Sequence, residues 1–292
     1  MVEMPAASPL LVWGFWLLPP VMIALLLAAV AVASRRAGIA PAPRVLGVGL
    51  GVLGFWALGL VLARAGLLRF GSLPPRPFLL FTLGFASTVA FARSAVGRDL
   101  GRHLPLSALV GVQSFRVLVE LLLHRGALDG LTPPQMTYAG WNFDVVTGLV
   151  ALPLALTIER GLASRRAALA FNALGALLLL NVITIAVLSM PTPLRVFMND
   201  PPNVWIAEAP FIALPTTLVP VALLGHLLLW QRLRDDRGQV GDALGAAVAA
   251  GRASSKGDGS DVGLAERMSP SASATDANRN IIRNSGDQLS VH

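Results

Sequence analysis

The sequence predicts an all-α polytopic membrane protein: a bundle of seven transmembrane helices followed by a disordered C-terminal tail. Only 13% of the 292 residues are charged, roughly half of the ~25% typical of soluble domains. The mean hydropathy is +0.66, and apolar runs long enough to cross a hydrocarbon core of ~30 Å recur through the chain. These features exclude a water-soluble globular domain. The chain has no cysteine, which excludes disulfides, thiol catalysis and cysteine-ligated metal centres.

Seven apolar segments are the predicted spans. They are Leu10–Ala33, Val45–Ala63, Phe78–Phe91, Pro105–Leu123, Val145–Ile158, Ala167–Leu188 and Val204–Trp230. Phe78–Phe91 and Val145–Ile158 are shorter than the ~20 residues that a span needs, so we expect each to include flanking residues. The last segment contains Pro210, Pro215 and Pro220, and we expect these prolines to break or unwind it.

The loop arginines predict an orientation. Alternate loops define two sides, and one side holds more than twice as many arginines as the other. The richer side has Arg35, Arg36, Arg44, Arg93, Arg98, Arg102, Arg160, Arg165, Arg166, Arg232, Arg234 and Arg237; the poorer side has Arg64, Arg69, Arg76, Arg125 and Arg195. The positive-inside rule puts the richer side in the cytoplasm. We therefore predict a bacterial inner-membrane protein with its N-terminus outside and its C-terminus inside.

The end of the chain has a different composition. Residues 235–292 are rich in Gly, Ser, Ala, Asp and Asn and have few large apolar side chains. Such a segment buries too little apolar surface to offset the entropy of ordering it. The predicted organisation is a membrane domain over residues 1–234 and a disordered cytoplasmic tail over residues 235–292. No basic stripe with interleaved aromatics occurs, so the predicted partner is the lipid bilayer and not nucleic acid.

A stripe of polar side chains marks the fourth span. Gln113, Arg116, Glu120 and His124 fall within about 80° of one another on a helix. Contact with lipid would be costly for them, so we expect the stripe to face the bundle interior. Arg116 and Glu120 are four residues apart and can pair. Two interpretations stay open: a neutralised pair that orients helices, or a site for a ligand or an ion.

Two outer loops add four candidate residues. Asn142 and Asp144 lie at the start of the fifth span. Either residue caps the helix there, or the two close a polar pocket with the stripe of the fourth span. Asn199 and Asp200 lie in a proline-rich loop before the last span, which is either a lid over the bundle or a simple connector. The candidate ligand-binding set is therefore Gln113, Arg116, Glu120, His124, Asn142, Asp144, Asn199 and Asp200.

Recognised catalytic and cofactor motifs are absent from the sequence. It has no HExxH, Walker or GxSxG motif. His124, Asp144, Asp200 and Glu208 lack a diagnostic ligand spacing, so we assign no metal site. A retinal Schiff base needs an intramembrane lysine, and the single lysine, Lys256, lies in the tail. The sequence identifies no cofactor.

Two stretches resemble a known family. One runs from Gln113 to Gly148, with the patterns QxFRxxVE and MTYxGxNFDxxxG; the other runs from Asn181 to His226, with TPLRVFMNxP, PFxxLP, LVP and a late histidine. Together they resemble a family of uncharacterised bacterial polytopic membrane proteins. The resemblance implies that these segments belong together, and it implies no activity.

The leading functional hypothesis is a non-enzymatic protein with a polar pocket open to the outer face. It would bind, transport or sense a small solute or an ion. Arg116 would hold an anionic or polar group, and Glu120 and His124 would handle a proton or a cation. One alternative is an intramembrane enzyme that acts on a lipid or an isoprenoid, with Glu120, His124 and Asp144 as acid–base groups. The other is a structural subunit of a membrane complex, in which the stripe only pairs helices.

Overall fold

The computed structural model describes residues 5–71 and 75–235, and all regular structure in these residues is helical. The all-α prediction is confirmed for them. The chain divides into two compact units, Met1–Gln239 and Val240–His292. The second unit and nearly all of the proposed disordered tail lie outside the described residues.

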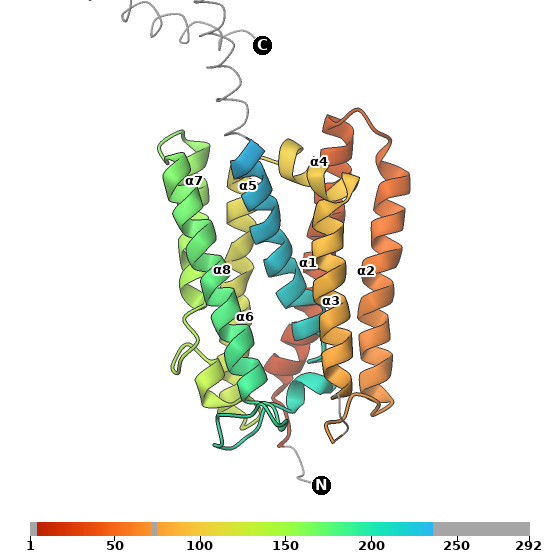
Figure 1. The fold of residues 1–292 in the computed structure, drawn as a ribbon, viewed down its shortest axis with the longest axis vertical. Helices are drawn as coiled ribbons and strands as arrows, with labels where there is room; N and C mark the ends of the chain where they lie inside the picture. The colour runs from red at the N-terminus through yellow and green to blue at the C-terminus, as the bar shows by residue number, and fades with distance from the viewer. Residues whose placement is uncertain (1–4, 72–74, 236–292) are drawn as a thin grey trace, which may run out of the picture. The chain divides into compact units, whose positions relative to one another are not determined.

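Most of the helices follow one another with short connections, but long segments join Leu128 to Val145 and Leu188 to Leu214 (Figure 1). They are α1 (Pro9–Arg36), α2 (Pro41–Arg64), α3 (Arg76–Arg93), α4 (Ala95–His103), α5 (Leu106–Gly111), η1 (Val112–Ser114), α6 (Phe115–Leu128), η2 (Pro134–Met136), α7 (Val145–Glu159), α8 (Arg165–Leu188), η3 (Trp205–Ala207) and η4 (Leu214–Leu218). η4 is a π-helical turn that continues as a helix to Asp235. We call Leu214–Asp235 the terminal helix.

Five helices of the described chain are long and apolar enough to cross a membrane: α1, α2, Leu106–Leu128, α8 and the terminal helix. Leu106–Leu128 is the predicted fourth span and contains α5, η1 and α6. Counting the bent pair α3–α4 as one span gives six. The fifth predicted segment is α7, whose 15 residues rise only ~22 Å. The structure therefore supports five to six candidate spans, and the seventh is not confirmed.

The third predicted segment ends at a sharp bend. α3 and α4 meet at 65°, and Ser94 lies at the junction with extended backbone. Its side-chain oxygen accepts a hydrogen bond from the Gly97 N–H at 3.2 Å and so caps α4. A Cβ at Gly97 would lie 2.2 Å from the Phe91 carbonyl oxygen, so the bend requires glycine there. α4 buries Leu100 and keeps its arginines near the arginine-rich end of the bundle.

The prolines of the last segment act at its start. The sequence predicted a span from Val204, but the helix begins at Leu214, after η3 and two turns. Pro210 has no N–H for a helix ladder and restricts the residue before it, so it favours the turn. Pro215 lies within the π-helical turn, while Pro220 is accommodated inside the helix. The predicted disruption is confirmed, but at the beginning of the helix and not along its length.

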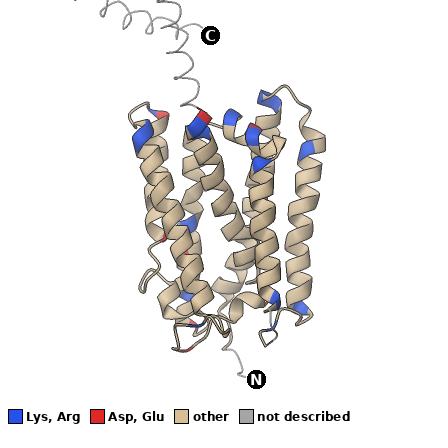
Figure 2. Ribbon diagram, in the orientation of Figure 1, with Lys and Arg blue, Asp and Glu red and all other residues tan. Residues whose placement is uncertain are grey.

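Charged residues gather at the two ends of the helices (Figure 2). At the end that holds the C-terminus of α1, Arg44 pairs with Asp99 at 2.6 Å. At the opposite end, Arg125 pairs with Asp129 at 2.8 Å. Between these ends lies an apolar core that contains one small group of charged side chains, and that group is the candidate functional site.

Candidate functional site

The centre of the site is a buried ion pair between Arg116 of α6 and Asp144, the residue before α7. Their side chains are 2% and 7% exposed. Arg116 Nε donates to Asp144 Oδ2 at 2.6 Å, and Arg116 Nη2 donates to Asp144 Oδ1. This is the two-pronged arrangement in which guanidinium and carboxylate planes match. Arg116 lies near the middle of Leu106–Leu128, so the charge of each partner is neutralised far from either end of the helix.

The remaining N–H groups of Arg116 are also bonded. Nη1 donates to His226 Nε2 at 2.8 Å, and both Nη atoms lie 3.3 Å from the Gly175 carbonyl oxygen. Because arginine only donates, His226 Nε2 must accept and carries no proton. The proton of the neutral imidazole is therefore on Nδ1, which donates to Asn172 Oδ1 at 2.9 Å. Arg116 thus joins α6 to α7, α8 and the terminal helix.

The pairing of Arg116 with Glu120, which the sequence suggested, is replaced by another arrangement. Asn142 Nδ2 donates to Glu120 Oε1 at 2.7 Å and to the Met136 carbonyl oxygen at 2.9 Å. Asn142 Oδ1 accepts from the Asp144 N–H at 3.0 Å. The side chain of Asp144 makes no capping bond to α7, and each of its two oxygens accepts a hydrogen bond from Arg116. The residue at the start of α7 is therefore an aspartate that belongs to the ion pair.

Glu120 has one oxygen without a partner. The residue is 1% exposed, and its Oε2 makes no hydrogen bond with any described residue. A buried carboxylate oxygen with no partner is costly, and such atoms need a specific explanation. This unpaired oxygen distinguishes Glu120 from Arg116, whose N–H groups all have hydrogen-bond acceptors.

Gln113 lies about one helical turn from Arg116. Its Nε2 donates to the Ala222 carbonyl oxygen at 3.1 Å, which joins η1 to the terminal helix. Its Oε1 has no partner among the described residues. The contact requires Gly225, because a Cβ there would lie 2.3 Å from Gln113 Nε2.

The other three predicted residues lie outside this cluster. His124 stacks on Tyr138 with the ring centroids 4.6 Å apart. Asn199 donates to Gln135 Oε1 at 2.8 Å. Asp200 has a side chain that is 92% exposed, 4.0 Å from Arg195. The structure therefore brings together Arg116, Glu120, Asn142 and Asp144, with Gln113 next to them, and it places the proline-rich loop residues elsewhere.

Sequence reasoning missed the contributions of His226, Asn172 and Gly175. His226 lies near the end of the last predicted span, Val204–Trp230. The number of residues between Arg116 and His226 does not predict their contact, because only the packing of the terminal helix against α6 and α8 brings the two side chains together. Among the described residues, no group of three or more His, Cys, Asp or Glu side chains is placed to hold a metal ion.

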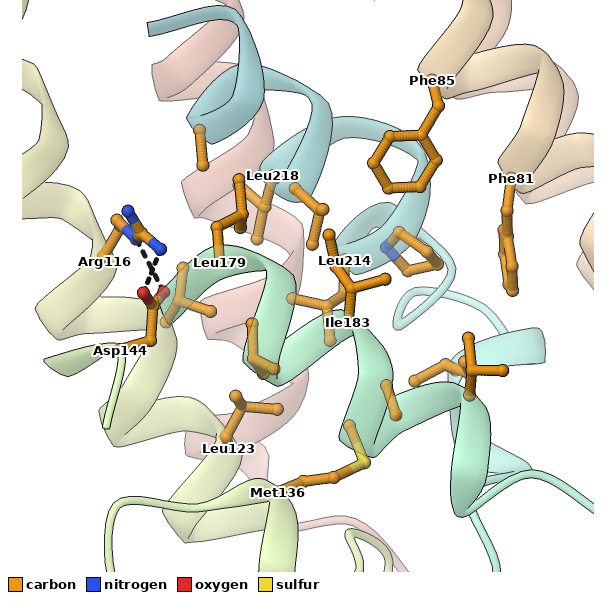
Figure 3. Close-up of a pocket in the computed structure, with 18 of the residues that line it drawn as sticks. Phe81, Phe85, Arg116, Leu123, Met136, Asp144, Leu179, Ile183, Leu214 and Leu218 are labelled. Atoms are coloured by element: carbon orange, nitrogen blue, oxygen red, sulfur yellow. Dashed lines mark hydrogen bonds and ion pairs between the residues drawn. The ribbon is translucent and has the colours of Figure 1, made fainter. Parts of the chain in front are cut away.

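A cavity of about 180 Å³ adjoins the cluster (Figure 3). Arg116 and Asp144 line one end of it, and Phe81 and Phe85 of α3 line the other (Figure 3). Glu120 also lines the cavity. The rest of its wall is almost wholly apolar and comes from α6, α8 and the terminal helix. Its lining residues on α3 and α8 include the exposed Thr82 and the half-buried Ile183, Val187 and Phe85. Exposed and half-buried lining residues on α3 and α8 bring this part of the cavity wall close to the side of the bundle.

The fold and this site define a helical membrane protein with a charged cluster buried in its core. The chain belongs to a family of unknown function: the domain of unknown function DUF8737 matches residues 74–234. The match includes the whole cluster and all residues that line the cavity, while α1 and α2 precede it. It agrees with the resemblance to an uncharacterised family. No curated protein and no solved structure matches the chain.

Proposed function

We propose that the protein binds a small amphiphilic molecule, which enters the cavity beside Glu120 from the lipid phase. The observation that carries this proposal is Glu120 Oε2, a buried carboxylate oxygen without a partner in the wall of an otherwise apolar cavity. An apolar body would fill the space between α3 and α8. A hydroxyl or amine on the same molecule would donate to Glu120.

The chemistry of the cluster favours such a ligand over a small anion or a polar solute. Every N–H group of Arg116 already faces an acceptor, in Asp144, His226 or Gly175. An anion would have to displace Asp144 from a buried pair, and breaking such a pair costs about 3–5 kcal/mol. Of the three charged residues that line the cavity in the described chain, Glu120 is the one that can take a new partner without losing an existing contact.

The same contacts support a non-enzymatic role. General acid–base chemistry needs groups that can exchange protons with a substrate. Asp144 binds Arg116 through both oxygens, and both nitrogens of His226 are engaged. Within the described cluster, Glu120 therefore has no second acid or base with which to catalyse a reaction. These contacts fit binding, sensing or passage of the ligand better than turnover of a lipid or an isoprenoid.

For the membrane arrangement, we propose seven spans in a bacterial cytoplasmic membrane, with the N-terminus outside. The seventh span is α7, which is short but apolar. A short span is accommodated by local thinning of the bilayer. The support for the orientation is the excess of arginine at the end of the bundle that holds Arg36, Arg44 and Arg102.

The proposal is tested by identifying what copurifies with the protein. Protein isolated from its native membrane in mild detergent is extracted with organic solvent, and the extract is analysed by mass spectrometry. Glu120→Gln keeps an acceptor for Asn142 but replaces the free carboxylate oxygen. We expect a near-stoichiometric molecule in the wild type and roughly tenfold less in Glu120→Gln, since a buried polar group that loses its hydrogen-bond partner costs ~1–3 kcal/mol.

The matched control is Glu159→Gln, the same change at a carboxylate that bonds Ser107 at the arginine-rich end. It should retain the molecule. Ala186→Phe, at a residue that lines the cavity, should exclude it. Wild-type protein without a copurifying molecule, or equal amounts in all variants, contradicts the proposal.

A second candidate is a structural subunit in which the cluster only fixes helix packing. The complete bonding of Arg116 favours it, because an arginine that joins four helical segments orients them without any ligand. This candidate predicts an empty cavity in the wild type.

A further inference from the structure

A second opening in the bundle lies between α1 and the helix formed by α5 and α6, away from the cavity beside Glu120. It is a groove of about 880 Å³. α1 packs against α2 and α4 and has little direct contact with α5. Small residues on both walls leave the space open. They are Ala28 and Ala29 on one wall, and Ala108 and Gly111 on the other. Leu224 of the terminal helix forms part of the floor.

The groove has the dimensions and surface of a lipid-facing site. Its α1 wall runs from Leu18 to Arg36, which is ~27 Å at 1.5 Å per residue. That exceeds the ~15 Å depth of one leaflet of the hydrocarbon core. Its rims carry exposed apolar side chains, among them Leu25 and Leu118, which are 50% and 52% exposed. An extended apolar chain lying in the groove would cover them.

One end of the groove carries a cation with an unused binding edge. Arg36 lines the mouth, and its Nη1 donates to the His103 carbonyl oxygen at 2.8 Å. That bond fixes the guanidinium while Nε and Nη2 make no hydrogen bond or ion pair with a described residue. These two N–H groups form the edge that binds a phosphate with two parallel hydrogen bonds.

The acidic residues at this end of the described chain are bonded elsewhere. Asp99 pairs with Arg44, Asp235 pairs with Arg102, and Glu159 bonds Ser107. The charge of Arg36 is therefore uncompensated at the mouth of an apolar groove. Basic pockets between membrane helices near the cytoplasmic surface are typical sites for anionic lipid head groups.

We propose that this groove binds an anionic phospholipid, with an acyl chain lying between α1 and α5–α6 and the phosphate on Arg36. The occupant is a bilayer lipid and not the molecule beside Glu120, because the groove ends in a surface arginine and the cavity ends in a buried carboxylate. The inference is independent of the proposed function. Its site also includes α1, which lies outside the stretch that the family model matches.

Native mass spectrometry of the full-length protein with added phosphatidylglycerol or phosphatidylcholine tests the proposal. We expect the wild type to retain one phosphatidylglycerol with about tenfold preference over phosphatidylcholine. Arg36→Ala should remove that preference. The matched control is Arg35→Ala, which deletes the same charge one residue away, at an exposed arginine that does not line the groove. It should behave like the wild type.

Two further variants separate the groove from non-specific attraction and from the cavity. Ala108→Trp fills the groove and should abolish lipid retention without removing a charge. Ala186→Phe fills the cavity beside Glu120 and should leave phosphatidylglycerol retention unchanged. Equal losses in Arg35→Ala and Arg36→Ala, or full retention in Ala108→Trp, would overturn the proposal, whatever the outcome for the molecule beside Glu120.

Discussion

Arg116 and Asp144 bind each other through two hydrogen bonds, with side chains that are only 2% and 7% exposed. Asp144 is the last residue before α7, and Arg116 lies near the middle of Leu106–Leu128, so the pair fixes the start of one helix against the centre of another. His226, Gly175 and Asn142 complete the coordination of the two side chains. The pair is therefore the point at which four parts of the chain are held together.

Removing either partner should destabilise the protein. We expect Arg116→Ala and Asp144→Ala each to lower the free energy of unfolding by about 3–5 kcal/mol, because the remaining charge is buried and unpaired. The double variant Arg116→Met, Asp144→Leu should recover much of that loss. Denaturant unfolding in micelles measures this.

The pair of Arg125 and Asp129, whose side chains are 39% and 6% exposed, provides the control for this comparison. Arg125→Ala removes this pair and a hydrogen bond to Ser8 Oγ, and should cost about 0.5–1.5 kcal/mol, well below the loss at Arg116. A double variant at Arg116 and Asp144 that is as unstable as the two single ones would show that the pair is not the main interaction there.

Gly175 is required by the close approach of α8 to the terminal helix. A Cβ at this position would lie 2.5 Å from His226 Cε1 and 2.8 Å from Thr147 Cγ2. Gly175→Ala should therefore lower the free energy of unfolding by about 1–3 kcal/mol through overpacking. Gly47→Ala on α2, where nothing lies within 4 Å, should instead be neutral or stabilising by about 0.5–1 kcal/mol. Equal effects at the two glycines would contradict the packing around His226.

The N-terminus of α1 should loosen in acid through Asp129. Burial raises the pKa of Asp129, but hydrogen bonds from Ser8 and the charge and hydrogen bond of Arg125 outweigh it, so the net pKa lies below its ordinary value. The stabilisation is fully present above the ordinary pKa of ~3.9 and is lost as the pH falls through the lowered value.

Amide hydrogen exchange near Ser8, corrected for the intrinsic pH dependence, measures this change. Exchange should accelerate only in strong acid in the wild type. In Asp129→Asn it should be faster at neutral pH and should show no further acid transition. A transition in the variant identical to that of the wild type would assign the effect to another group.

Single cysteines test the membrane orientation without background, because the chain has none of its own. Leu162 lies between α7 and α8, Met198 lies in the loop after α8, and both side chains are more than 70% exposed. An impermeant maleimide should label Met198→Cys in intact cells and Leu162→Cys only after lysis. The reverse pattern would invert the topology, and labelling of both in intact cells would show that α8 does not cross the membrane.

Much of the fold was predictable because membrane helices are encoded locally. The apolar run Val145–Ile158 became α7 with nearly the same ends, and Ala167–Leu188 became α8. The bend after α3 was not predicted, because it depends on Ser94 as a cap and on Gly97 as the only residue that fits there. The late start of the terminal helix was not predicted either, since the apolar residues 204–213 form η3 and turns and not a continuous helix.

The candidate site was predictable in composition but not in pairing. The helical spacing of Gln113, Arg116 and Glu120 correctly placed them on a buried face, because a polar stripe on an apolar helix must face inward. Their partners come from other segments, and no periodicity along one helix reveals that Asp144 binds Arg116 more closely than Glu120 does. His226 and Asn172 join only through tertiary packing.

The most direct test is an experimental structure of the protein in lipid nanodiscs, prepared from its native membrane. Non-protein density in the cavity between α3 and α8, within hydrogen-bonding distance of Glu120 Oε2, is the expected result, and the density should be absent in Glu120→Gln and in Ala186→Phe. A wild-type cavity that is empty or filled by its own side chains, or density that makes no contact with Glu120, would contradict the account.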